Sequence, residues 1–192
     1  MSARVPTAHG GVGRRDAALD SAIQTFVRFG YRKTSMDDIA RAAGVSRPGL
    51  YFLFDSKPVL FREAIERALD RDLSVIAELL DDGRPLRVRL LAAFDRWVGS
   101  YIGPLTEQTA GVHDFDPAML GSVRDTAPRR FQELVTKAIA EEYPTDAADR
   151  ARTLVSASIG IKQQVASREL CAEPLGIAID LILGPSANPQ SR

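Results

Sequence analysis

Apolar residues recur at intervals of three and four positions along most of this chain, which is the period of a helix that buries one side. The first such stretch starts near Asp16 and ends at Gly30. Its apolar positions are Leu19, Ala22, Ile23, Phe26 and Val27. No stretch shows the strict alternation of apolar and polar residues that a half-buried strand requires. The pattern therefore predicts an all-α protein.

Longer helices are predicted in the rest of the chain, separated by glycine and proline. They cover residues 56–80, 86–102, 128–143, 145–169 and 175–183. A short helix of about ten residues is expected after Asp116, where aspartate and proline stand in the order of a cap and a first helical turn. The segment from Gly103 to Asp116 is the least regular part of this region.

Residues 34–57, TSMDDIARAAGVSRPGLYFLFDSK, have a more specific pattern of helix starts and stops. Thr34 or Ser35 can cap a first helix, because a side-chain oxygen there accepts a hydrogen bond from the first turn. Gly44 stands where that helix must end and the backbone needs a positive φ. Ser46 can then cap a second helix, with a proline in its first turn.

The spacing within this stretch predicts how the two helices meet. Counted from Met36 as the first position, alanine stands fifth, glycine ninth and leucine fifteenth. Two helices that cross through a turn of three or four residues need a small residue, a turn glycine and an apolar residue from the second helix. The stretch is therefore predicted to be a helix-turn-helix, whose second helix, from about Arg47 to Leu53, would lie in the major groove of DNA.

Seven residues of this stretch are candidates for contact with DNA. Three in the first turn of the second helix would meet base edges: Arg47, Pro48 and Gly49. Four with hydroxyl or ammonium groups would hold phosphates: Thr34, Ser35, Tyr51 and Lys57. The alternative is an ordinary helical hairpin in which Tyr51 and Phe52 only serve the core. Leu50 and Phe52 are expected to be buried in either case.

Residues 18–65 resemble the N-terminal domain of the TetR (tetracycline-repressor) family, through ALDSAIQTFVRFGY, the stretch quoted above, and LFREAI. The resemblance implies a homodimeric repressor of a double-stranded DNA operator, released by a small-molecule effector. It also implies that the two C-terminal helices form a four-helix bundle across the dimer axis. The family pattern favours polar side chains at positions 49 and 53, where this chain has Gly49 and Leu53. Base recognition would therefore depend more strongly on Arg47.

Four parts are expected along the chain. They are a flexible tail over residues 1–14, a DNA-binding domain over 15–57, a helical regulatory and dimerisation domain over 58–184, and a tail over 185–192. Small and apolar residues in the last two helices suit close approach of a partner. They are Leu154, Ser156, Ala157, Ile159, Gly160, Ile161, Ile177, Leu181 and Leu183. They could instead only close the core of the monomer.

The net charge of zero hides an asymmetry. Up to Lys57 the chain has nine lysines and arginines against five aspartates, whereas the rest has 16 basic and 20 acidic groups. A basic N-terminal third suits a module that binds phosphates. Arg14 and Arg15, before the first predicted helix, could follow DNA phosphates or belong to a solvated tail.

Aromatic residues after position 90 are candidates for an effector pocket. Phe94, Trp97 and Tyr101 stand at i, i+3 and i+7, and His113 follows in the irregular segment. Aromatic walls with a few polar groups are typical of small-molecule pockets. They are equally typical of the edge of a core. Trp97, Tyr101 and His113 are the candidate ligand-binding residues.

Several functional classes find no support in the sequence. A single cysteine, Cys171, excludes an intramolecular disulfide and fits the cytoplasm, and no run of about 18 apolar residues could cross a membrane. Two histidines are too few for a zinc site, and no nucleophile or phosphate-loop motif is present. We therefore expect that the protein is not an enzyme and that it binds no cofactor or metal ion. The alternatives are a helical ligand-binding or catalytic protein with a vestigial DNA-binding module, or a nonspecific architectural DNA binder.

Overall fold

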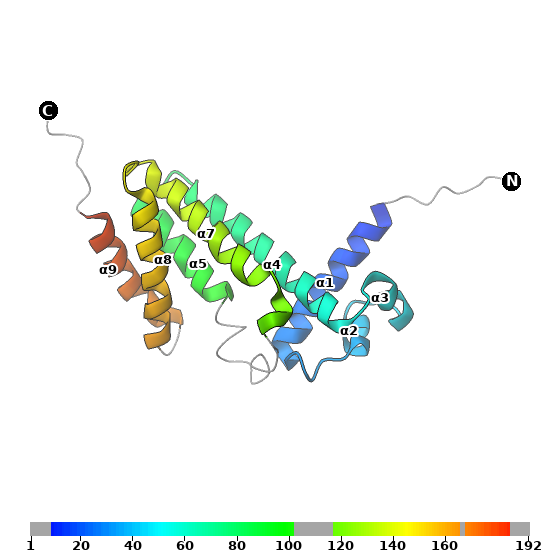
Figure 1. Cartoon of the computed structure of the whole chain (residues 1–192). Helices are drawn as coiled ribbons and strands as arrows, with labels where there is room; N and C mark the ends of the chain where they lie inside the picture. The colour runs from blue at the N-terminus through cyan, green and yellow to red at the C-terminus, as the bar shows by residue number, and fades with distance from the viewer. Residues whose placement is uncertain (1–8, 102–116, 166–167, 185–192) are drawn as a thin grey trace, which may run out of the picture. The chain divides into compact units, whose positions relative to one another are not determined.

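The computed structural model describes residues 9–101, 117–165 and 168–184, and every regular element in these ranges is a helix (Figure 1). The prediction of an all-α fold is therefore confirmed. None of the described helices is both long enough and apolar enough to cross a bilayer.

Two compact units make up the chain. One lies within Met1–Leu69 and Pro104–Arg124, and the other within Asp70–Gly103 and Asp125–Arg192. The division falls inside helix α4 (Lys57–Leu80) and after the second residue of helix α7 (Val123–Ala140), so both helices contribute residues to both units.

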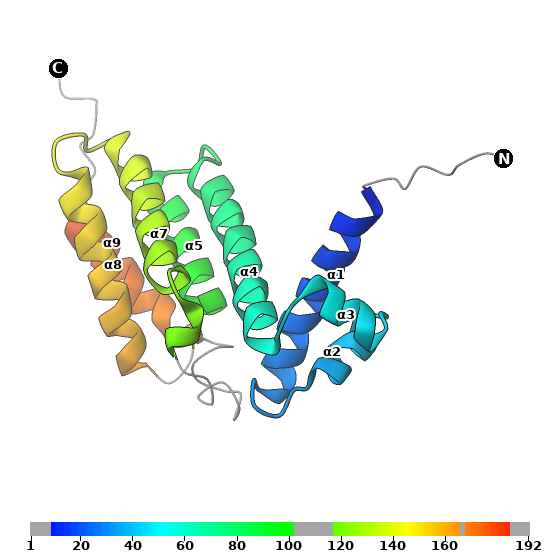
Figure 2. The same cartoon turned by 45° about the vertical axis from the view of Figure 1, so that its right-hand side comes forward.

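The first unit is built around three helices at the N-terminal end of the chain. They are α1 (His9–Phe29), α2 (Met36–Ala42) and α3 (Arg47–Leu53). Helix α2 packs on α1, and α3 packs on α2, as Figure 2 shows. The N-terminal part of α4 and a 3-10 turn, η2 (Pro117–Leu120), belong to the same unit.

The two short helices begin where their sequences predict. The Ser35 hydroxyl accepts a hydrogen bond from the Asp38 N–H at 3.1 Å, and the Asp38 carboxylate accepts one from the Ser35 N–H at 3.0 Å. This reciprocal capping box starts α2. Gly44, in the turn that follows, has a φ of +65°, which residues with a Cβ rarely adopt. Ser46 caps α3 by accepting a hydrogen bond from the Gly49 N–H at 3.1 Å.

Aromatic rings form much of the core of the first unit. Phe26 of α1 meets Phe61 of α4 edge-on, with ring centroids 5.0 Å apart. The Tyr31 ring lies 5.6 Å from the Phe26 ring and 4.8 Å from the Phe61 ring. These contacts hold α1 and the loop that follows it against the start of α4.

The prediction that Phe52 is buried is wrong. Leu50 of α3 and Phe54, directly after the helix, are the buried residues, with exposures of 0% and 1%. Phe52 stands two positions after Leu50 and therefore projects from nearly the opposite side of the helix. Its side chain is 89% exposed.

Helix α1 begins at His9, earlier than the apolar pattern predicts, and includes residues assigned to the tail. Arg14 in these early turns is exposed, and the first side chain described as buried is Ala18. The periodicity of apolar residues cannot reveal helical turns that bury little.

The second unit combines the C-terminal part of α4 with further helices. These are α5 (Leu86–Tyr101), α7 (Val123–Ala140), α8 (Ala147–Gln164) and α9 (Ala172–Leu183), with a 3-10 turn, η3 (Arg168–Cys171), before α9. Figure 2 shows α5, α7 and the C-terminal part of α4 side by side, and α8 packs on α9. Phe94 of α5 and Phe131 of α7 meet edge-on in the core, with ring centroids 5.0 Å apart.

Helix boundaries in the second unit differ from the predicted ones. Helix α7 begins at Val123, so Pro128 lies inside it rather than at its start. Val123, Ala127 and Phe131 are all buried and stand at i, i+4 and i+8. The small alanine in the middle makes this apolar stripe weak in the sequence, whereas the proline is conspicuous.

Candidate nucleic-acid interface

The exposed side of α3 carries the residues predicted to meet base edges. Pro48 and Phe52 are each two positions from the buried Leu50, so they point away from the core, and we call them the outer ridge. The residues on the two flanks of the outer ridge are Arg47 with Tyr51, and Gly49 with Leu53. The outer ridge is thus apolar, and the cation lies on one flank.

Arg47 is held in place by Asp37, the second residue of α2. The Arg47 Nε lies 3.2 Å from Asp37 Oδ1, and the Arg47 Nη1 donates to Asp37 Oδ2 at 3.2 Å. The guanidinium carbon also lies 5.8 Å from the centre of the Tyr51 ring. Two helices and one aromatic face therefore restrict the position of this side chain.

The Asp37 contact leaves Arg47 able to bind a base. A guanidinium has five N–H donors, and the carboxylate engages two of them. The remaining donors can form the bidentate pair of hydrogen bonds that guanine O6 and N7 accept. Sequence reasoning missed Asp37 because an acidic residue in a first helical turn is explained by the helix dipole alone.

Arg15 of α1 fixes the C-terminal end of α3. Its guanidinium donates to the Leu53 carbonyl oxygen and pairs with Glu63 of α4. Its Cζ lies 4.3 Å from the centre of the Phe54 ring. Arg15 is therefore engaged within the protein, whereas Arg14 is exposed and lines a hollow together with Gly49 and Leu53 of α3.

Lys57, the first residue of α4, is half-buried beside the loop between α1 and α2. Its Nζ donates to the Arg32 carbonyl oxygen at 3.5 Å and lies 4.2 Å from the centre of the Tyr31 ring. Partial burial lowers the pKa of the Lys57 ammonium from its ordinary value. A phosphate at this position would replace a long hydrogen bond to a carbonyl oxygen with a contact between opposite charges.

The two hydroxyl residues before α2 lie in different environments. Ser35 is exposed, and its hydroxyl donates to the Asp38 carboxylate at 2.6 Å. Thr34 is buried, with 2% exposure, and its hydroxyl donates to the Gly30 carbonyl oxygen at 2.7 Å. Ser35 therefore lies on the surface, where a phosphate can reach it. The phosphate contact predicted for Thr34 does not fit its buried hydroxyl, which instead stabilises the loop beneath Ser35.

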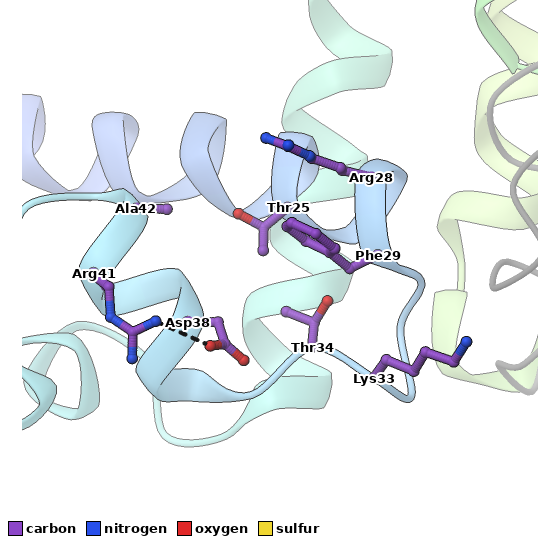
Figure 3. Close-up of a pocket in the computed structure, with 8 residues that line it drawn as sticks. All are labelled: Thr25, Arg28, Phe29, Lys33, Thr34, Asp38, Arg41 and Ala42. Carbon is purple, nitrogen blue, oxygen red and sulfur yellow. Dashed lines mark ion pairs between the residues drawn. The ribbon is translucent and has the colours of Figure 1, made fainter.

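A basic hollow of about 620 Å³ opens between α1 and α2 (Figure 3). Its lining residues are Thr25, Arg28, Phe29, Lys33, Thr34, Asp38, Arg41 and Ala42. Three of them are cations, and the carboxylate among them lies 3.5 Å from Arg41. Hydrogen bonds from Ser35 hold the pKa of the Asp38 carboxyl below its ordinary value. Sequence reasoning missed Arg28 and Arg41 because single surface cations give no periodic signal.

The predicted effector residues are described only in part. Trp97 has 6% exposure, and its ring stacks on Phe131 with centroids 4.4 Å apart and planes 2° apart. His113 and the side chain of Tyr101 lie outside the described residues. Within the described ranges, no group of histidine, cysteine, aspartate and glutamate is arranged to hold a metal ion.

Apolar side chains are also exposed on the last two helices. Ile159 of α8 is 50% exposed, and Ile177 and Leu181 of α9 are 55% and 78% exposed. Leu154 of α8 and Leu183 of α9 were also predicted to face a partner, but both are buried in the second unit, so that part of the prediction is wrong. The two helices therefore have a buried side and an apolar exposed side.

The part of the chain that carries this surface is similar in sequence to known proteins. The family model "Bacterial regulatory proteins, tetR family" matches residues 18–64, which include α2 and α3. The chain is 46% identical to the HTH-type transcriptional repressor ComR of Escherichia coli over 57 residues, which cover 30% of this chain and 27% of ComR. It is 39% identical to the HTH-type transcriptional activator FasR of Mycolicibacterium smegmatis over 82 residues, covering 43% and 37% of the two chains.

The chain thus spans well under half the length of both relatives. Its fold is similar over a much longer stretch to the solved structure of a transcriptional regulator from Cytophaga hutchinsonii, with a TM-score of 0.76. That match covers 89% of this chain and 97% of the other, at 18% identity. The likeness therefore concerns the all-helical architecture, including the regions beyond the helix-turn-helix.

Proposed function

This chain belongs to the tetR family of bacterial regulatory proteins, and we propose that it is a sequence-specific DNA-binding transcriptional regulator. The observation that carries the proposal is the outward face of α3. This helix is capped by Ser46 and anchored by Leu50, and it presents Arg47 beside the outer ridge. A short helix presented in this way suits the major groove.

We assign the contacts by the chemistry of each exposed group. Arg47, Pro48 and Gly49 meet base edges, and Ser35, Tyr51 and Lys57 hold phosphates. Thr34 supports the loop that carries Ser35. The cations of the basic hollow, Arg28, Lys33 and Arg41, extend the phosphate contacts beyond the helix-turn-helix.

The regulator acts as a homodimer. The exposed side chains Ile159, Ile177 and Leu181 offer an apolar surface on two neighbouring helices, which a second copy can cover with the same surface. Two copies would then contact half-sites separated by about 34–36 Å along the DNA. Residues 15–57 serve as the DNA-binding domain and residues 58–184 as the regulatory and dimerisation domain.

The protein represses transcription in the cytoplasm, and a small-molecule effector releases it from its operator. ComR is named a repressor and FasR an activator, so both modes of regulation occur among proteins with a similar helix-turn-helix. An effector that favours one dimer geometry would weaken operator binding, and such couplings are typically about 1–3 kcal/mol. The role is one of binding rather than catalysis.

Selection of duplexes from a random pool by the full-length protein tests the proposal. We expect enrichment of an inverted repeat that is bound at least about 1,000-fold more tightly than a shuffled duplex. A gel shift with DNA flanking the gene, repeated with a compound library, then tests the operator and the effector. Equal affinity for all sequences, with a steep dependence on salt, would instead indicate a nonspecific DNA binder.

A further inference from the structure

Phe52 is the most exposed of the large apolar side chains that the structure describes, at 89%. A phenyl ring in water contributes little to the stability of its own helix, because it removes almost no apolar surface from solvent. The core position beside α3 is already filled by Phe54. The ring of Phe52 is therefore available to a partner.

The surroundings of Phe52 leave room for an apolar group. Gly49, one turn earlier on α3, has no side chain beyond its hydrogen, and a hollow of about 460 Å³ lies beside the ring. Its lining residues are Arg14, Gly44, Val45, Ser46, Gly49, Phe52 and Leu53. The Ser46 hydroxyl in this hollow is already bonded to the Gly49 N–H. Phe52 and Leu53 thus provide apolar contact surface, and the exposed Arg14 adds a cation to the same hollow, which suits a partner that carries phosphates beside an apolar group.

The chemistry of the flank indicates what the partner must be. Arg47 lies on one side of the outer ridge, and its guanidinium keeps donors beyond those that Asp37 engages. A partner that covers α3 must therefore offer both hydrogen-bond acceptors and an apolar group within a few ångströms of each other. The major groove does so where guanine, with O6 and N7, neighbours thymine, with its C5-methyl group.

We propose that Phe52 packs against the C5-methyl group of thymine in the major groove and thereby determines part of the sequence preference. The proposal rests on the DNA-binding function proposed above. Pro48, the other residue of the outer ridge, also has no side-chain donor or acceptor for a base edge. The preferred half-site accordingly has thymine at the positions facing the outer ridge, beside the base that Arg47 contacts.

The test removes the methyl group from the DNA rather than from the protein. In the duplex selected from a random pool, each thymine of a half-site is replaced in turn by uracil, which differs only in lacking this methyl group. Binding of the full-length protein is measured by fluorescence anisotropy. We expect the affinity to fall about fourfold for each contacted methyl group, and to stay unchanged at other thymines.

The same duplexes are then titrated with Phe52→Ala and Phe52→Leu. With Phe52→Ala we expect the thymine and uracil duplexes to bind alike, because the group that contacts the methyl is gone. Phe52→Leu, which keeps an apolar side chain, should retain part of the preference. Phe29→Ala is the matched control, since it removes a 50% exposed phenyl ring from α1 in the same unit. Because Phe29 lines the basic hollow, any change in affinity should be equal for the thymine and uracil duplexes, and the preference should stay intact.

Each outcome distinguishes the inference from the function on which it rests. If the wild-type protein selects a sequence but binds thymine and uracil duplexes equally at every position, the Phe52 contact is wrong and the function stands. If Phe52→Ala keeps the full preference, another group contacts the methyl and the assignment to Phe52 is wrong. If the wild-type protein selects no sequence from the pool, the proposed function itself fails.

Discussion

Helices α3 and α9 both expose a large apolar side chain, but the charges around these side chains differ. Phe52 of α3 and Leu181 of α9 are 89% and 78% exposed. Arg47, on the flank beside Phe52, keeps guanidinium donors available to a further ligand. Asp180, next to Leu181, is already paired with Arg87 of α5, whose Nη2 donates to it at 2.9 Å.

This difference separates two kinds of interface within one chain. An apolar group beside a cation with available donors suits a partner that is both anionic and apolar in places, such as the major groove. An apolar group whose charged neighbour is already neutralised suits an apolar partner, such as the same surface of a second copy. Exposure alone would have assigned the same role to both helices.

The largest effect is expected from the buried side of α3. Leu50→Ala removes a side chain with 0% exposure and should cost about 2–5 kcal/mol of unfolding free energy, measured by urea denaturation. Leu175→Ala on the buried side of α9, with 2% exposure, is the matched change. We expect operator affinity to be lost in the folded Leu50→Ala protein and largely kept in Leu175→Ala. Similar operator affinity in both variants would show that α3 needs no such anchor.

The exposed side of α9 is tested by Leu181→Asp. If α9 lies in the proposed dimer interface, a carboxylate buried there should weaken dimerisation by about 2 kcal/mol or more, which is roughly 30-fold. Sedimentation equilibrium measures this change. Phe52→Asp is the control, because an acidic residue on α3 should leave the monomer–dimer equilibrium unaltered while it abolishes operator binding. A dimer that resists Leu181→Asp would assign dimerisation to another surface.

Arg47→Ala tests the cationic flank of the outer ridge. Loss of a bidentate contact should reduce discrimination at one base pair by roughly 1–3 kcal/mol, measured by competition between duplexes that differ at that position. Lys57→Ala should instead weaken binding to all sequences alike and reduce the slope of log K against log salt by about 1. Equal losses on operator and shuffled duplex for Arg47→Ala would remove it from the base contacts.

The smallest effect concerns the cap that positions α2. Because hydrogen bonds from Ser35 lower the pKa of Asp38 in the folded protein, its carboxylate contributes stability above the pKa of the unfolded chain. That contribution is lost as the pH falls through the lower, folded-state pKa. Wild type should therefore unfold at a higher temperature than Asp38→Asn at neutral pH, and the two should converge in acid. Asp55→Asn, at an exposed site outside α2, serves as control.

Much of the local structure of the first unit could be predicted from short-range patterns in the sequence. Serine before a helix, proline in its first turn and glycine at a turn each act within a few residues. For this reason the caps at Ser35 and Ser46 and the positive φ of Gly44 could be predicted. The order of the helices could be predicted in the same way, because similar start and stop signals recur along the chain.

The arrangement of the interface depended on contacts between elements and could not be predicted in this way. Asp37 and Arg47 are ten positions apart and meet only because α2 and α3 cross. Phe52 was assigned to the core by its hydrophobicity, although its rotation relative to Leu50 already places it outward. That error was avoidable, because helical geometry alone separates these two positions.

The contacts of Arg15 have a consequence for protein engineering. One side chain of α1 holds the last carbonyl of α3, the ring of Phe54 and the carboxylate of Glu63. Chimeras that receive a foreign recognition segment over residues 47–53 should therefore preserve these three partners. Shortened expression clones that start after position 15 would lack the guanidinium and could present the grafted segment at a different angle to the duplex.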